Sequence, residues 1–121
     1  MELVSEVLVG IIAALHVWFL VLEMFLWQKP LGLKTFGLSA EDAAVSATLA
    51  KNQGLYNGFL AAGLVCGVIA ADPVGFGFKV FFLACVLLAG LYGGFTVSRR
   101  ILVVQALPAA VALALVLAAR V

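Results

Sequence analysis

Four long apolar stretches, separated by short polar or proline-containing segments, make up most of the chain and predict four α-helices. We expect helices over residues 3–28, 40–71, 73–96 and 101–119. Each is long enough to cross a bilayer, which needs about 20 apolar residues. Most connections are short, so neighbouring helices should be antiparallel. The predicted fold class is all-α, an antiparallel bundle of four transmembrane helices that forms one integral membrane domain over residues 1–121.

Capping and helix-breaking residues set the expected boundaries. Pro30 should end the first helix, because it disfavours helix at the preceding residue and has no amide proton. The segment from there to Ser39 is expected to be a loop at the membrane interface, with Ser39 as the cap of the second helix. That helix exceeds the length of a span, so its first turns should extend beyond the membrane on the cytoplasmic side. Asp72 and Pro73 should open the third helix, and Pro108 should kink the fourth.

Composition also indicates a membrane protein. Of the 121 residues, 66% are hydrophobic and 11% are charged, whereas soluble domains average roughly 45–50% apolar residues. The net charge of +1 provides no electrostatic basis for binding nucleic acid. The N-terminus lacks the basic region of a signal peptide, so the first apolar stretch is expected to be retained as a span. Cys66 and Cys85 lie in apolar stretches and are expected to be small packing residues.

Basic residues are distributed unevenly between the two expected sides of the membrane. The first and third connections carry Lys29, Lys34, Arg99 and Arg100. The opposite side carries only Lys79 and Arg120. The positive-inside rule therefore places the first and third connections in the cytoplasm and both termini outside the inner (plasma) membrane. The lipid bilayer is the first expected partner.

Two polar side chains on the first helix, His16 and Glu23, are costly in lipid. They are seven residues apart and share one helical face, which should point toward protein or a water-filled cavity. Glu6 falls off that face. The predicted ligand-binding residues are Glu23, Asn52, Gln53, Tyr56, Asn57, Tyr92 and Gln105. At about 1.5 Å per residue these lie near the cytoplasmic ends of four helices, which predicts a polar pocket open to that side with His16 at its floor.

Glu23 and His16 each have a structural and a functional interpretation. Structural partners for Glu23 would be Lys29, Arg99, Arg100 or, with the carboxyl group protonated, Asn57. Functionally, Glu23 would bind a ligand or transfer a proton, and His16 is either a satisfied core histidine or a working group. We expect no metal, because the two side chains are too far apart along one helix to share an ion easily. We expect no cofactor, because no phosphate loop, zinc or haem spacing occurs.

Three functions fit this pattern. The first is binding or transport of a small ligand or a proton at Glu23, which predicts a homo-oligomer because four short helices rarely enclose a path alone. The second is an intramembrane enzyme in which His16 and Glu23 are the catalytic acid and base for a lipid-soluble substrate. The third is a structural subunit whose polar side chains form interhelical hydrogen bonds. The sequence does not decide whether the protein is an enzyme.

Several motifs together resemble a known family. They are H-x6-E-M-F-x-W at residues 16–27, F-G-L at 36–38, N-Q-G-x-Y-N-G-F-L-A-A-G at 52–63, and Val104-Gln105 near Pro108. This combination, which extends over nearly the whole chain, is similar to the domain-of-unknown-function 1304 family of small membrane proteins. The resemblance implies a four-helix integral membrane protein, mostly bacterial, without an established activity. It implies no chemistry for the polar residues.

Overall fold

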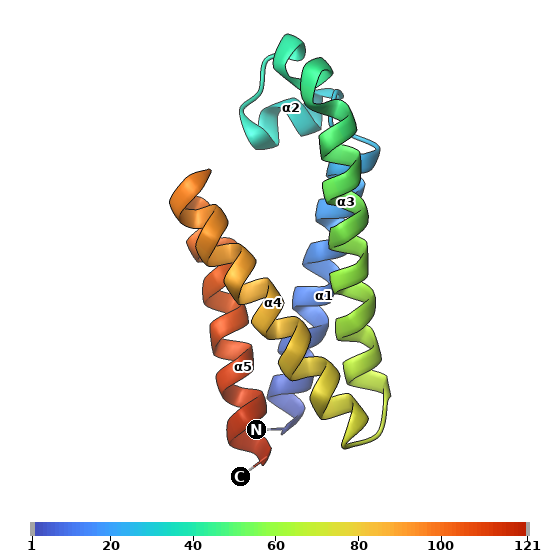
Figure 1. Ribbon diagram of the computed structural model, residues 1–121, viewed down its shortest axis with the longest axis vertical. Coiled ribbons are helices and arrows are strands. Elements are labelled where there is room, and N and C mark those ends of the chain that lie inside the picture. The colour runs from blue at the N-terminus through green and yellow to red at the C-terminus, as the bar shows by residue number, and fades with distance from the viewer. Residues whose placement is uncertain (1, 121) are drawn as a thin grey trace. The chain divides into compact units, whose positions relative to one another are not determined.

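The computed structural model describes residues 2–120, and every regular element in this range is a helix (Figure 1). In chain order the elements are α1 (Glu2–Met24), α2 (Pro30–Phe36), α3 (Ala40–Ile69), α4 (Val74–Thr96), the π-helical turn η1 (Leu102–Ala106) and α5 (Leu107–Arg120). The prediction of an all-α chain is confirmed. The four expected helices correspond to α1, α3, α4 and the continuous pair η1–α5.

Three helical segments are long and apolar enough to cross a membrane. Among the described residues these are Glu2–Met24, Val74–Thr96 and Leu102–Arg120. The helix α3 is longer than any of them but does not belong to this group. The structure is therefore compatible with a membrane protein. A fourth span in α3 stays a prediction, and so does a single domain over residues 1–121.

The chain divides into two compact units. The central unit consists of residues 14–61, which include the second half of α1, all of α2 and most of α3. The terminal unit consists of residues 1–13 together with residues 62–121, and contains α4, η1 and α5.

In the central unit, α1 and α3 pack closely at two glycines of α3. The side chains of Leu20 and Met24 on α1 lie against Gly58 and Gly54 on α3. Residue numbers rise along α1 as they fall along α3, so the two segments are antiparallel, as expected. Small residues on α3 make this close approach sterically feasible.

The expected interfacial loop between the first two long helices is wrong over residues 30–36, which form the short helix α2. Pro30 opens α2 because its fixed φ suits the first helical position, where no amide donor is needed. Gly37 ends it in the left-handed conformation, with φ 66°. A Cβ on Gly32 would lie 1.9 Å from the carbonyl oxygen of Leu26. Only glycine allows α2 to lie this close to the turn at residues 25–29.

Side-chain hydrogen bonds hold this turn and the start of α3. The predicted cap is confirmed, since Ser39 Oγ accepts a hydrogen bond of 3.1 Å from the backbone amide of Asp42. Trp27 donates a hydrogen bond from Nε1 to Ser46 Oγ at 3.1 Å. Its ring packs against Phe36 of α2 with a centroid distance of 4.9 Å. Trp27 therefore links the turn to both α2 and α3.

In the terminal unit, α4 pairs with η1 and α5. A Cβ on Gly90 would lie 2.8 Å from the backbone nitrogen of Ala106, and one on Gly94 would lie 2.2 Å from Leu102 Cδ2. These contacts make the two segments antiparallel. The backbone amide of Leu107 bonds to the carbonyl of Leu102, which is the five-residue spacing of a π-helix. The π-helical turn thus ends at Ala106, two residues before Pro108, and the kink expected at Pro108 stays a prediction.

The start of α4 differs slightly from the expected cap. The helix begins at Val74, with Pro73 as the flanking residue rather than the first helical one. Asp72 Oδ1 still accepts a hydrogen bond of 3.0 Å from the backbone amide of Phe76. The carboxylate thus satisfies one of the amides that a helix start leaves without an intrahelical partner.

Candidate functional site

Glu23 and Asn57 form the polar contact between α1 and α3. Asn57 Nδ2 donates a hydrogen bond to Glu23 Oε1 across 34 residues of sequence. Glu23 is half-buried, and Asn57 is only 8% exposed. The carboxylate therefore lies inside the central unit, with a neutral amide rather than a cation as its hydrogen-bond partner.

Glycines on α3 position this contact. A Cβ on Gly54 would lie 2.6 Å from Met24 Cγ and 3.1 Å from Glu23 Cβ, while one on Gly58 would lie 2.7 Å from Leu20 Cδ1. Every larger residue at these positions would push α3 away from α1. The glycines that flank Asn57 in the sequence motif therefore bring its amide within reach of Glu23.

The other polar residues predicted on the same helix lie elsewhere. Asn52, Gln53 and Tyr56 are exposed. At about 100° per residue, Asn52 lies about 140° around the helix axis from Asn57. Only Asn57 of this set faces α1. The sequence motif predicts these residues as one cluster. In the structure they lie on different sides of α3.

His16 is fully buried, at 0% exposure. Its ring packs edge-to-face on Phe19, with a centroid distance of 5.3 Å and an interplanar angle of 74°. His16 thus lies in the interior, shielded from solvent, two helical turns from Glu23 along α1.

Tyr92 and Gln105 belong to the terminal unit. Tyr92 is 75% exposed, and Gln105 Nε2 donates a hydrogen bond of 3.1 Å to the carbonyl of Val86. Gln105 therefore bridges the π-helical turn to α4. A single polar layer formed by all four long helices stays a prediction.

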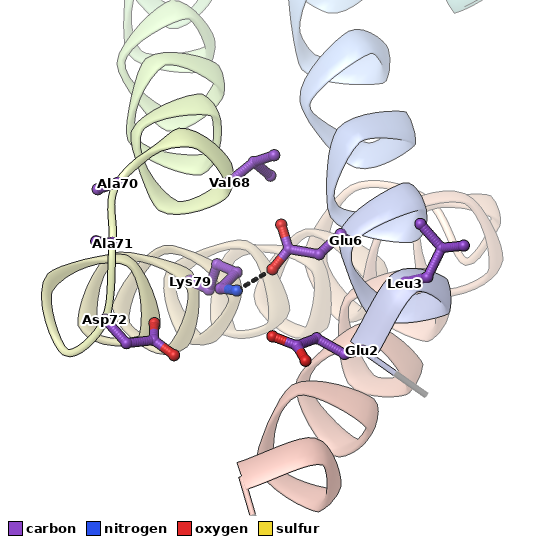
Figure 2. A pocket seen from close by; sticks show the side chains of 8 residues that line it. All are labelled: Glu2, Leu3, Glu6, Val68, Ala70, Ala71, Asp72 and Lys79. Atoms are coloured by element: carbon purple, nitrogen blue, oxygen red, sulfur yellow. Dashed lines mark hydrogen bonds and ion pairs between the residues drawn. The ribbon is translucent and has the colours of Figure 1, made fainter.

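A second polar region, the terminal cavity, lies within the terminal unit (Figure 2). Its volume is about 550 Å³, and its lining consists of Glu2, Leu3, Glu6, Val68, Ala70, Ala71, Asp72 and Lys79. Lys79 on α4 forms an ion pair with Glu6 on α1, and the two side chains are 10% and 24% exposed. Figure 2 shows the carboxylates of Glu2 and Asp72 directed toward each other from opposite sides of the cavity.

The Glu6–Lys79 pair was not among the predicted site residues. A signal for it exists in the sequence, since Glu6 departs from the polar face of the first helix and Lys79 lies within an apolar stretch. Nothing in the spacing links two residues 73 positions apart. Asp72, one of the lining residues, also has a basic neighbour: Arg120 Nη1 lies 3.6 Å from Asp72 Oδ2, and Arg120 Cζ lies 4.3 Å from the ring centroid of Phe76.

Metal-ligating and thiol side chains are dispersed in the part of the chain that the structure describes. No three His, Cys, Asp or Glu residues between positions 2 and 120 lie close enough together to hold a metal ion. Cys66 and Cys85 are free thiols, exposed and half-buried respectively. No group of these residues suggests a cofactor site.

Comparison with known proteins identifies the family. The uncharacterized protein YpaA of Lactococcus lactis subsp. lactis (strain IL1403) is 27% identical over 105 residues, which cover 84% of this chain and 87% of YpaA. No solved structure matches the chain. A family model described as "Protein of unknown function (DUF1304)" matches residues 10–117, which include Glu23, Asn57 and all the motifs of the sequence. The chain belongs to the DUF1304 family.

Proposed function

We propose that this protein is an integral membrane protein that reversibly binds a proton at Glu23 and carries it across the bilayer. The observation that carries the proposal is the Glu23–Asn57 hydrogen bond. An amide orients a carboxylate without neutralising its charge. Glu23 therefore keeps a site for an exchangeable positive partner on a mostly apolar helix.

The comparison with Glu6, on the same helix, supports this choice. Glu6 is paired with Lys79, so its charge is already balanced. No ion pair within residues 2–120 involves Glu23. Lys29, Arg99 and Arg100, the expected structural partners, are all exposed. Because an acid in a membrane span without a fixed counter-charge is normally functional, Glu23 is the stronger candidate of the two.

The proposal includes a four-span arrangement. In it α3 crosses the membrane with the three more apolar helices, and both termini lie outside. The polar residues of α3 would then face protein rather than lipid, which is how polar groups are accommodated in spans. Asn57 meets this condition by bonding to Glu23.

The test is proton flux into vesicles that contain the purified protein and an enclosed pH-sensitive dye. Wild-type protein should dissipate an imposed pH gradient. Glu23→Gln should abolish this flux, because an amide of nearly the same size cannot take up a proton. Glu23→Asp, which retains the carboxylate, should restore part of it.

The matched control is Glu6→Gln, the same chemical change on the same helix at a carboxylate paired with Lys79. It should leave the flux near the wild-type rate, provided that circular dichroism shows intact helices. Absence of flux with wild-type protein, or undiminished flux with a folded Glu23→Gln protein, would contradict the proposal.

A further inference from the structure

An uncovered stripe of five residues runs along α3, on the side away from α1. We call it the α3 seam; it consists of Val45, Leu49, Asn52, Tyr56 and Phe59. All five are exposed, with Val45 at 83% and Leu49 at 73%. Their spacing alternates between four and three residues, which is the pattern by which one helix packs along another. The contacts of α3 with α1 use the opposite side, through Gly54 and Gly58.

Neither water nor lipid is a suitable cover for this seam. Water would leave the four large apolar side chains of the seam exposed, although burial of such side chains is favourable. Lipid would leave the carboxamide of Asn52 without a hydrogen-bond partner, and this group is costly to bury unpaired. The helix α3 is also the one long helix of the described chain that is not apolar enough to qualify as a span. A protein surface satisfies both kinds of side chain.

We propose that the α3 seam is the contact surface between two copies of this chain, with Asn52 of each copy hydrogen-bonded to Asn52 of the other. Copies inserted in one membrane share one orientation, and a symmetric dimer is related by an axis along the membrane normal. The two α3 helices then run parallel, and each seam residue meets its own counterpart.

The chemistry of Asn52 suits this symmetric position. A carboxamide is both donor and acceptor, so two identical side chains can satisfy each other across the axis. A single polar residue within an apolar seam also specifies register and oligomeric state. Polar groups of this kind act as interhelical contacts in membranes. The α3 seam lies on the side of α3 opposite Glu23, so this contact does not depend on what Glu23 binds.

Single-cysteine cross-linking tests the contact directly. Cys66→Ala and Cys85→Ala remove both native thiols, and each seam position Leu49, Asn52 and Tyr56 is then replaced in turn by cysteine. Mild oxidation of intact membranes should convert most of each variant to a disulfide-linked dimer on a non-reducing gel. Because each chain carries one cysteine, the disulfide must join two copies.

Lys51→Cys in the same background is the matched control. Lys51 is exposed and adjacent to Asn52 in sequence, but about 100° away around the helix. It should form little dimer. Absence of dimer at all three seam positions would overturn the proposal, since lipid or another part of the same chain would then cover the seam. Equal cross-linking at Lys51 would overturn it too, because random collision would explain the product.

A second measurement uses proteins without new cysteines. Asn52→Asp places two carboxylates against each other at the axis, so the dimer fraction in native mass spectrometry should fall. Asn52→Gln keeps both donor and acceptor and should retain the dimer. Circular dichroism checks that both variants keep their helices. An unchanged dimer fraction in Asn52→Asp would contradict the assignment of Asn52 to the interface.

Discussion

Single glycines decide how closely helices meet in this protein. Gly54 faces α1, where a Cβ would lie 2.6 Å from Met24 and 3.2 Å from the backbone oxygen of Leu20. Gly10, by contrast, has no atom within 4 Å of the equivalent position. The same residue type therefore has a packing role at one position and none at the other.

This difference predicts opposite effects on stability. Gly54→Ala should lower the free energy of unfolding by about 1–3 kcal/mol, the usual cost of an overpacked contact. Gly10→Ala should raise it by up to about 1 kcal/mol, because alanine is the better helix former. Thermal unfolding in detergent, followed by circular dichroism, compares the two variants. A Gly54→Ala protein as stable as wild type would show that α1 and α3 are not in close contact at this position.

Pairs of elements are held by interactions that reach far along the sequence. In the terminal unit the ion pair between Glu6 and Lys79 joins α1 to α4. A buried charge is stabilised by its partner and is costly once that partner is removed. The pair therefore links two helices. Its removal should lower the stability of the protein mainly when only one of the two charged residues is replaced.

A double-mutant cycle follows from this reasoning. Lys79→Met alone leaves the Glu6 carboxylate unbalanced and should destabilise the protein by about 2–3 kcal/mol, below the 3–5 kcal/mol seen for fully buried pairs, because Glu6 is 24% exposed. Adding Glu6→Leu should recover most of that loss. Denaturant unfolding of the wild type, both single variants and the double variant measures the coupling. Strictly additive losses would argue against the link.

At the scale of the whole molecule, the position of α3 relative to the membrane determines the topology of the chain. Three helices qualify as spans by length and composition, and α3 does not. Three spans would place the two termini on opposite sides, whereas four place them on the same side. The number of crossings thus determines on which side of the membrane each terminus lies.

Reporter fusions distinguish these arrangements. Alkaline phosphatase is active only outside the cytoplasm, so with four spans it should be active when fused to either terminus. A green fluorescent protein fused at the same sites, which fluoresces in the cytoplasm, should be dark in both. Activity at only one terminus would show that α3 does not cross the membrane, and the proposed path for Glu23 would then need revision.

The amino-acid sequence alone determines the helical class, the apolar segments and several local features. Ser39 caps α3 as predicted, because a cap depends on residues within one turn. The helix α2 was locally encoded as well, by Pro30 at its start and Gly37 at its end. The sequence pattern nevertheless predicts a loop there, because Pro30 also marks the end of the first apolar stretch and a proline can either end a helix or start one.

Only the tertiary structure decides which polar side chains meet. Helical periodicity shows that Asn52 and Asn57 point in different directions, but not which of them faces α1. Contacts at Gly54 and Gly58 settle this in favour of Asn57. The pairing of Glu6 with Lys79 likewise depends on how distant helices pack. Local sequence specifies helices and their ends through short-range hydrogen bonds, whereas long-range packing selects the partners of each helical face.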